Sequence, residues 1–224
     1  MSRAQGSASG GRRLVVVLVE PAGPLNVGSV ARLIANFSSA DLAIELRLVA
    51  PRCDHRGDEA QRMAVHGRGV LERASLYGDL AAALADCGAV LATSGRGEGE
   101  PLPVLELDSA MQWLQAQRLQ AQPSLHAQPA ALVFGREDRG LSAAELLQAG
   151  ALLQISTGGD YRSLNLSHAV ALVLHALHQA QLQGGAPVPV QPALAPRGAV
   201  EAMLSDAEAL LLNVGFLYPH TAAA

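Results

Sequence analysis

The sequence contains no lysine, and all 16 of its basic residues are arginines. This absence excludes Schiff-base catalysis by a lysine and the phosphate-binding lysine of P-loop enzymes. The formal net charge of −4 at pH 7 argues against a protein whose whole surface binds polyanions. A nucleic-acid partner would therefore be held by a local group of arginines or by a second copy of the chain.

Other absences narrow the class further. No apolar run approaches the roughly 18 residues that a membrane span needs. Residues 1–13 are rich in Gly and Ser but have no apolar h-region, so they predict a disordered tail and not a signal peptide. Cys53 and Cys87 do not have a metal-ligand spacing, and two reduced thiols indicate a cytoplasmic protein. His175 and His178 lack an acid or thiol partner nearby, so we expect no metal site.

Strand-like and helix-like hydrophobic patterns alternate along the chain. The Val-rich run at 14–20 is typical of a strand buried on both faces. Strands are predicted at 14–20, 42–49, 89–93, 130–134 and 152–155. Helices are predicted at 58–67, 79–86 and 107–119. Two further helices have a predicted N-cap: one runs from Asn26 to Phe37 and the other from Ser142 to Gln148. Five or six strands alternating with helices predict an α/β fold with a mostly parallel sheet. Ligands of such sheets bind beyond the carboxyl ends of the strands.

The clearest helix is predicted at residues 165–183. Its apolar residues recur at the 3.6-residue period and predict one buried face. These residues are Leu166, Val170, Val173, Leu174 and Leu177. Residues 184–198 are rich in Pro, Gly and Ala and predict a linker. We therefore expect one domain at 14–183, followed by the linker and by a C-terminal helical segment at 199–224.

The segment after the first predicted strand contains Asn26, Gly28 and Arg32. A capped helix with Gly28 at a close packing contact explains part of this pattern. The spacing of Gly23 and Gly28 resembles part of a P-loop, but the lysine of that motif is missing. We therefore do not expect nucleoside triphosphate binding.

Two later loops carry polar residues directly after buried strands. Thr93-Ser94-Gly95-Arg96 has small residues that leave backbone N–H groups accessible to a ligand. Four charged residues, 136–139, stand between Gly135 and Gly140 after the strand at 130–134. A salt-bridged turn would explain them, and a ligand-binding loop is the alternative.

A fourth polar segment opens the long helix, with the sequence Tyr161-Arg162-Ser163-Leu164-Asn165. Ser163 or Asn165 as an N-cap is a sufficient structural explanation. A helix N-terminus also favours a polar or anionic ligand group, so the segment is a candidate binding loop as well.

Taken in order, the elements NxGxxxR, TS-small-R, FGRE-x-x-GL and YxSLNL resemble the SpoU/TrmH-type SPOUT RNA methyltransferases, and within them the TrmJ group. The resemblance runs from about Leu14 to Pro219. It implies a C-terminal trefoil knot with a short helical extension, a homodimer, and S-adenosylmethionine as methyl donor. It also implies methylation of a tRNA ribose 2′-hydroxyl at cytidine or uridine 32, the first nucleotide of the anticodon loop.

The resemblance also assigns roles to individual residues. The cofactor contacts would be Thr93, Ser94, Gly95, Gly135, Ile155, Arg162, Ser163 and Leu164. Arg32, Ser163 and Asn165 would be catalytic, and the residues that shape loops or contact substrate would be Asn26, Gly28, Arg96, Arg136, Glu137 and Tyr161. A guanidinium has no acceptor and stays charged, so we expect Arg32 to stabilise the developing alkoxide or to hold a phosphate.

The sequence departs from the family pattern in four places. Arg162 replaces a residue that is commonly small, and Asn36-Phe37-Ser38-Ser39 stands where a Gly turn is usual. Ile155-Ser156-Thr157 replaces the usual Ile-Pro-Thr, and Gly158-Gly159 follows, which makes this loop more flexible. Relatives continue with a basic helical hairpin beyond Ala224, so 199–224 resembles a truncated extension. The alternatives are an rRNA ribose 2′-O-methyltransferase and a catalytically weak RNA-binding knot protein. A generic nucleotide-binding α/β domain is disfavoured because no complete phosphate motif is present.

Overall fold

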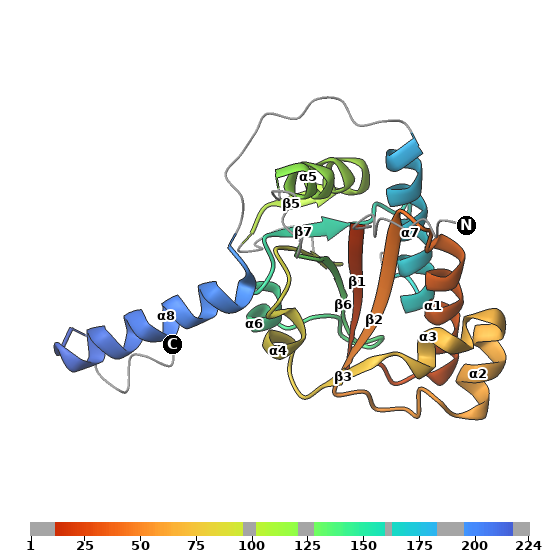
Figure 1. Cartoon of the computed structure of the whole chain (residues 1–224), viewed down its shortest axis with the longest axis horizontal. Coiled ribbons are helices and arrows are strands. Elements are labelled where there is room, and N and C mark those ends of the chain that lie inside the picture. Colours follow the sequence, from red (N-terminus) through yellow and green to blue (C-terminus); the bar gives the residue numbers. More distant parts are fainter. Residues whose placement is uncertain (1–11, 96–101, 121–127, 160–162, 183–194, 217–224) are drawn as a thin grey trace, which may run out of the picture.

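Seven strands form one sheet at the centre of the molecule, in the order β3-β2-β1-β6-β4-β7-β5 (Figure 1). The computed structural model describes residues 12–95, 102–120, 128–159, 163–182 and 195–216, without the side chains of 118–120. The strands are β1 (Arg12–Val19), β2 (Leu42–Val49), β3 (Ser75–Tyr77), β4 (Ala89–Thr93), β5 (Val104–Glu106), β6 (Ala130–Phe134) and β7 (Ala151–Gln154). Every pairing between these strands is parallel, so their carboxyl ends lie at one edge of the sheet. The predicted α/β fold with a mostly parallel sheet is confirmed.

Helices cover both faces of the sheet. They are α1 (Pro24–Phe37), α2 (Asp58–Ala64), the 3₁₀ helix η1 (Val65–Gly67), α3 (Arg68–Glu72), α4 (Leu80–Leu84), α5 (Leu107–Gln120), α6 (Ala143–Leu146), α7 (Leu166–Leu182) and α8 (Arg197–Asn213). Buried residues of α1, α5 and α7 share one core with the sheet, and those of α4 and α6 share the other. Helices α2 and α3 pack against α1. No helix in the described part of the chain is long and apolar enough to cross a membrane.

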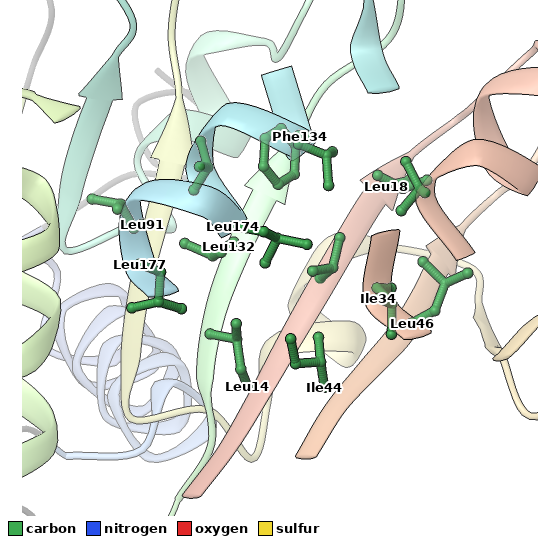
Figure 2. Packing of buried hydrophobic residues seen from close by; sticks show 14 of the residues in the cluster. Leu14, Leu18, Ile34, Ile44, Leu46, Leu91, Leu132, Phe134, Leu174 and Leu177 are labelled. Atoms are coloured by element: carbon green, nitrogen blue, oxygen red, sulfur yellow. The ribbon is translucent and has the colours of Figure 1, made fainter. Parts of the chain in front are cut away.

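The apolar run of β1 is explained by burial on both sides. Its alternate side chains enter the two cores, Leu14, Val16 and Leu18 the first and Val15, Val17 and Val19 the second. On the first face, Leu14 and Leu132 lie under Leu174 and Leu177 of α7 (Figure 2). A central parallel strand therefore needs an almost continuous apolar sequence. The predicted apolar face of α7 is confirmed, since all five of the residues assigned to it are buried.

The first helix begins differently from the prediction. Proline occupies the first turn of α1, Gly23 is the N-cap residue, and no side chain caps the helix. The prediction of Asn26 as N-cap is wrong, because the fixed φ of Pro24 suits the first helical position and the helix starts there. The amide of Asn26 is therefore available for contacts outside its own helix. The packing role expected for Gly28 is confirmed, since a Cβ there would lie 2.3 Å from the carbonyl oxygen of Ala60.

Two predicted boundaries need correction, that of the N-terminal tail and that between the linker and the C-terminal helix. The tail does not extend to residue 13, because the backbone N–H of Arg12 donates to Asp41 and the Arg13 guanidinium pairs with Glu45 at 2.8 Å. The predicted linker 184–198 overlaps α8, which starts at Arg197. Backbone bonds to the α4 region hold the start of α8, and no residue of this helix is buried. The helix extends away from the sheet (Figure 1).

Three short elements were not predicted. Strands β3 and β5 have three residues each, and α3 has five. A strand of three residues is too short to show an alternating pattern, and both strands lie at the edges of the sheet. Their pairing with β2 and β7 is therefore a consequence of the folded sheet and not a local sequence signal.

Candidate active site

A cavity of about 310 Å³ lies beyond the carboxyl ends of β4, β6 and β7. Its volume is at the lower end of the range of about 300–1,000 Å³ that is usual for small-molecule sites. All predicted cofactor residues that the structure describes line it, namely Thr93, Ser94, Gly95, Gly135, Ile155, Ser163 and Leu164. Arg162, Arg96 and Tyr161 lie outside the described residues. Three loops that are distant in the sequence thus meet at one cavity.

The loop after β4 is held against the two neighbouring strands. The Thr93 hydroxyl donates to the carbonyl of Val133 at 3.1 Å, and the Ser94 N–H donates to the carbonyl of Leu153 at 3.0 Å. Gly95 continues this loop along the cavity, and a Cβ there would meet no atom within 4 Å. The small residues therefore form a fixed wall with free space in front of Gly95.

The loop after β6 closes on itself as a tight turn. Arg136 and Gly140 exchange backbone hydrogen bonds at 3.2 and 3.0 Å, and Gly140 has a φ of 69°. A Cβ at Gly135 would lie 2.3 Å from the carbonyl carbon of Gly140 and 2.5 Å from the nitrogen of Leu141. Glycine is thus required at Gly135 by close backbone approach and favoured at Gly140 by its left-handed conformation.

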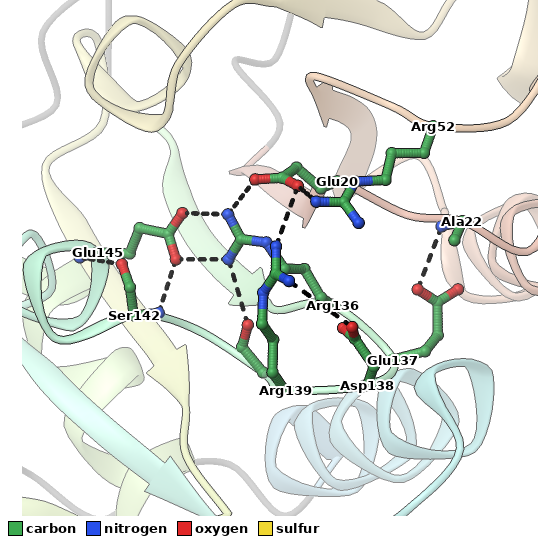
Figure 3. A network of polar contacts seen from close by, with 10 residues as sticks. Glu20, Ala22, Arg52, Arg136, Glu137, Asp138, Arg139, Ser142 and Glu145 are labelled. Carbon is green, nitrogen blue, oxygen red and sulfur yellow. Dashed lines mark hydrogen bonds and ion pairs between the residues drawn. The ribbon is translucent and has the colours of Figure 1, made fainter.

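Three of the four charged residues of this turn, Arg136, Asp138 and Arg139, form ion pairs. Arg136 forms a bidentate pair with Glu145 at 2.8 and 2.9 Å and also pairs with Glu20 (Figure 3). Arg52 and Arg139 pair with the same Glu20 carboxylate. The hydrogen bond from Arg136, together with the positive charges of Arg136 and Arg52, lowers the pKa of Glu20 to about 2. The salt-bridged turn that the sequence left open as an explanation is present.

Glu137 connects the same turn to the start of α1. Its carboxylate accepts hydrogen bonds from the N–H groups of Ala22 at 3.2 Å and Gly23 at 3.1 Å, and from Nδ2 of Asn26 at 3.1 Å. Burial raises the pKa of Glu137, but these donors outweigh burial and bring the pKa below its ordinary value. Oδ1 of Asn26 in turn accepts from Nδ2 of Asn165 at 3.0 Å. One hydrogen-bonded chain therefore joins the loops after β1, β6 and β7.

Asn165 also caps α7. Its Oδ1 accepts from the N–H groups of Ser167 at 2.9 Å and His168 at 3.3 Å, and from the Ser167 hydroxyl at 2.8 Å. Of the two candidate N-caps, Asn165 is the one confirmed. Ser163 is exposed and lines the cavity, where its side chain can meet a ligand.

Arg32 does not lie at the cavity. Its side chain is exposed on α1, is not part of the lining, and makes no hydrogen bond or ion pair with any other described residue. It follows Asn26 by six residues, a rise of roughly 9 Å along the helix axis. Within one chain, the structure therefore brings the predicted cofactor residues together but leaves Arg32 apart from them.

Sequence reasoning missed Glu20 and noted Arg139 only as one of the four charged residues 136–139. Glu20 follows the apolar run of β1 directly and has a φ of 45°, which is rare for residues other than glycine. The sequence signal that could have indicated Glu20 is a single carboxylate directly after a buried strand. Its three arginine partners come from two other loops, so only the folded chain shows them.

The model of the SpoU rRNA methylase family matches residues 13–175. The chain belongs to this family. The tRNA (cytidine/uridine-2′-O-)-methyltransferase TrmJ of Pectobacterium atrosepticum is 32% identical to this SpoU-family chain over 91% of its length and 81% of the relative's. The crystal structure of TrmJ from Z. mobilis ZM4 has a TM-score of 0.74 and 30% identity, and the match covers 92% of this chain and 83% of that one. The predicted resemblance is confirmed.

The name of a further similar solved structure gives 2-OH methylation of C/U34 on tRNA. It has a TM-score of 0.57 and 26% identity, and the match covers 79% of this chain and 94% of that one. Both names state 2-O methylation of cytidine or uridine on tRNA, and the second also gives position 34, which bears on the target nucleotide proposed below.

Proposed function

We propose that this protein is an S-adenosylmethionine-dependent tRNA ribose 2′-O-methyltransferase. One observation carries the proposal: in a SpoU-family chain, the residues that match the family's cofactor motifs line one cavity at the carboxyl edge of the sheet. The similarity to TrmJ over most of both chains supports tRNA as the substrate and ribose 2′-oxygen as the acceptor.

The lining of the cavity fits the cofactor. Phe134, Leu153, Ile155 and Leu164 provide apolar surface for a purine, and the loops after β4 and β6 present backbone groups for its polar edge. Gly95 leaves open space where any side chain would stand. When bound, S-adenosylmethionine would supply a methyl group that is transferred to an attacking oxygen while the C–S bond breaks and S-adenosylhomocysteine leaves. The residues that line the cavity would hold that methyl group in line with the ribose oxygen. Such alignment lowers the activation barrier by several kcal/mol.

For Arg32 to act at a cofactor cavity, the cavity must belong to a second chain. The Arg32 side chain is exposed on α1 and absent from the cavity of its own chain, so we propose a homodimer in which Arg32 of one subunit serves the cavity of the other. A guanidinium cannot accept a proton, so Arg32 would stabilise the developing alkoxide or hold the neighbouring phosphate. The proton would pass to a phosphate oxygen or to water. Ser163 and Asn165, beside the start of α7, would orient the reacting groups.

We also propose the finer features of the fold that the family implies. These are a trefoil knot formed by the C-terminal part of the domain at 14–183, and a helical extension that contains α8. The similarity in fold to the crystal structure of TrmJ from Z. mobilis ZM4, with a TM-score of 0.74, supports this proposal. A tRNA substrate and two free cysteines support a cytoplasmic location.

The target nucleotide follows from the TrmJ resemblance, and we propose cytidine or uridine 32. The experiment is incubation of the purified protein with total tRNA, ribosomal RNA and labelled S-adenosylmethionine, followed by mapping of the labelled nucleotide. We expect a 2′-O-methyl group at nucleotide 32 of tRNA. Label at nucleotide 34 would assign the other anticodon-loop position, label in ribosomal RNA alone would overturn the tRNA assignment, and no label in either RNA would indicate a binding protein.

A further inference from the structure

A second cavity of about 370 Å³ adjoins the first and shares Gly95 and Ile155 with it. We call it the side pocket. Its lining consists of Gly95, Glu106, Gln154, Ile155, Ser156, Thr157, Gly158 and Gly159. The first cavity alone is at the lower limit for a ligand of the size of the cofactor. A ligand that fills it has room to continue past Gly95 and Ile155.

The two cavities differ in charge. Two arginines, Arg136 and Arg139, line the first together with the acids Glu137 and Asp138, whereas Glu106 is the one charged residue among the described residues that line the side pocket. Glu106 is the last residue of the edge strand β5 and lies opposite Gln154 of β7 in the register of the sheet. The side pocket is therefore a site for hydrogen-bond donors and contains no described cation, while the first cavity contains the exposed guanidinium of Arg139, whose two ion pairs are long, at 3.6 and 3.8 Å.

The Glu106 carboxylate is held in position. The Ser156 hydroxyl donates to its Oε2 at 2.5 Å, and its Oε1 has no hydrogen-bond partner among the described residues. The hydroxyl oxygen of Thr157 is buried and likewise has no partner among them. Buried polar atoms are normally hydrogen-bonded, so the Thr157 hydroxyl is available to a ligand, and the exposed Oε1 of Glu106 can accept from one as well. Ser156, which stands where proline is usual in the family, thus provides the hydrogen bond that holds the Glu106 carboxylate in place.

We propose that Glu106 binds the ribose diol of the cofactor, with Ser156 as a positioning residue; this inference rests on the proposed function. A vicinal diol offers two O–H donors to a carboxylate, as in dinucleotide-binding folds where an acidic residue binds the ribose. The amino-acid end of the cofactor fits less well, because its own carboxylate would stand beside Glu106 without a cation. The ribose thus lies at the junction of the cavities, and the amino-acid end lies toward Arg139.

The test is calorimetric titration of the full chain with S-adenosylhomocysteine and with 5′-methylthioadenosine, which lacks the amino-acid end. Removal of a hydrogen bond to a charged group costs about tenfold or more in affinity, so Glu106→Ala should weaken both ligands by about tenfold. Ser156→Ala should weaken both by less. Asp108→Ala is the matched control, since Asp108 is an exposed acid in the first turn of α5 and does not line the side pocket. It should leave both affinities unchanged.

The 2′-deoxy form of 5′-methylthioadenosine isolates the hydroxyl contact. Glu106→Ala should reduce its affinity much less than that of the parent nucleoside. Equal losses for the two nucleosides, no loss for either, or a loss for S-adenosylhomocysteine alone would each overturn the assignment to the diol. Failure of the unmodified protein to bind S-adenosylhomocysteine would overturn the proposed function itself. Thermal unfolding of each variant without ligand should match the unmodified protein, because Glu106 is exposed.

Discussion

Asn165 donates a hydrogen bond from its Nδ2 to Oδ1 of Asn26 at 3.0 Å, although the two residues are 139 positions apart in the sequence. The other end of the Asn26 amide donates to Glu137 at 3.1 Å. Both ends of one side chain thus link the start of α1 to two loops that border the cavity. A change at Asn26 would therefore act on the shape of the site without contacting the proposed cofactor.

Asn26→Ala should lower the free energy of unfolding by about 1–3 kcal/mol, because it removes a donor from Glu137 and an acceptor from Asn165. Urea denaturation measures this loss. Combined with Asn165→Ala, the loss should be smaller than the sum of the two single losses by roughly 0.5–1.5 kcal/mol. Ser29→Ala is the control, since its hydroxyl donates only to Leu25 within the same helix. Additive losses would show that the two asparagines act independently.

Substitution by alanine should have different effects at two glycines that line the cavity: lower stability at Gly135 and weaker ligand binding at Gly95. Gly135→Ala forces a Cβ against the backbone of Gly140 and should cost about 1–3 kcal/mol of stability. Gly95→Ala places its Cβ more than 4 Å from any atom of the described residues, so thermal unfolding should not change. Since Gly95 lines both cavities, its new methyl group should lower the affinity for S-adenosylhomocysteine several-fold. Equal melting temperatures for the two variants would contradict the steric argument.

The ion pairs of Glu20 predict a dependence of stability on pH. The pKa of this carboxyl is about 2 in the folded chain, against an ordinary value of 4.5. A lowered folded pKa means that its stabilisation is complete above pH 4.5 and is lost as the pH falls toward 2. Over this interval, the free energy of unfolding should fall more steeply for the unmodified protein than for Glu20→Gln. Parallel curves from urea titrations would show that Glu20 makes no such contribution.

Arg32→Lys should lower turnover by about 10²–10³-fold, the usual cost of removing a donor that stabilises an oxyanion. Stability should not change, because the exposed Arg32 side chain makes no hydrogen bond or ion pair with another described residue. Filter binding of tRNA and thermal unfolding would verify that affinity and folding are retained. Arg62→Lys, at another exposed arginine, should leave turnover unchanged. Near-normal turnover of the Arg32 variant would contradict a role that depends on guanidinium geometry.

The long elements were predictable because burial on both faces leaves a strong mark on the sequence. The strands at 42–49, 89–93 and 130–134 have the predicted ends, and the Ser142 capping box is present. The prediction of Asn26 as N-cap is wrong because Pro24, two positions earlier, has the fixed φ of a first helical residue and starts the helix there. The contacts of Glu20 and Glu137 could not be predicted, since their partners come from loops that meet only after the sheet forms.

The most direct test of the account is calorimetric titration of the purified protein with S-adenosylhomocysteine. We predict saturable binding of one ligand per chain, retained in Leu76→Trp, an exposed position on β3, and lost in Leu164→Trp, which fills the cavity. Absence of heat with the unmodified protein, or undiminished binding by Leu164→Trp, would contradict the claim that these separated loops form one cofactor site.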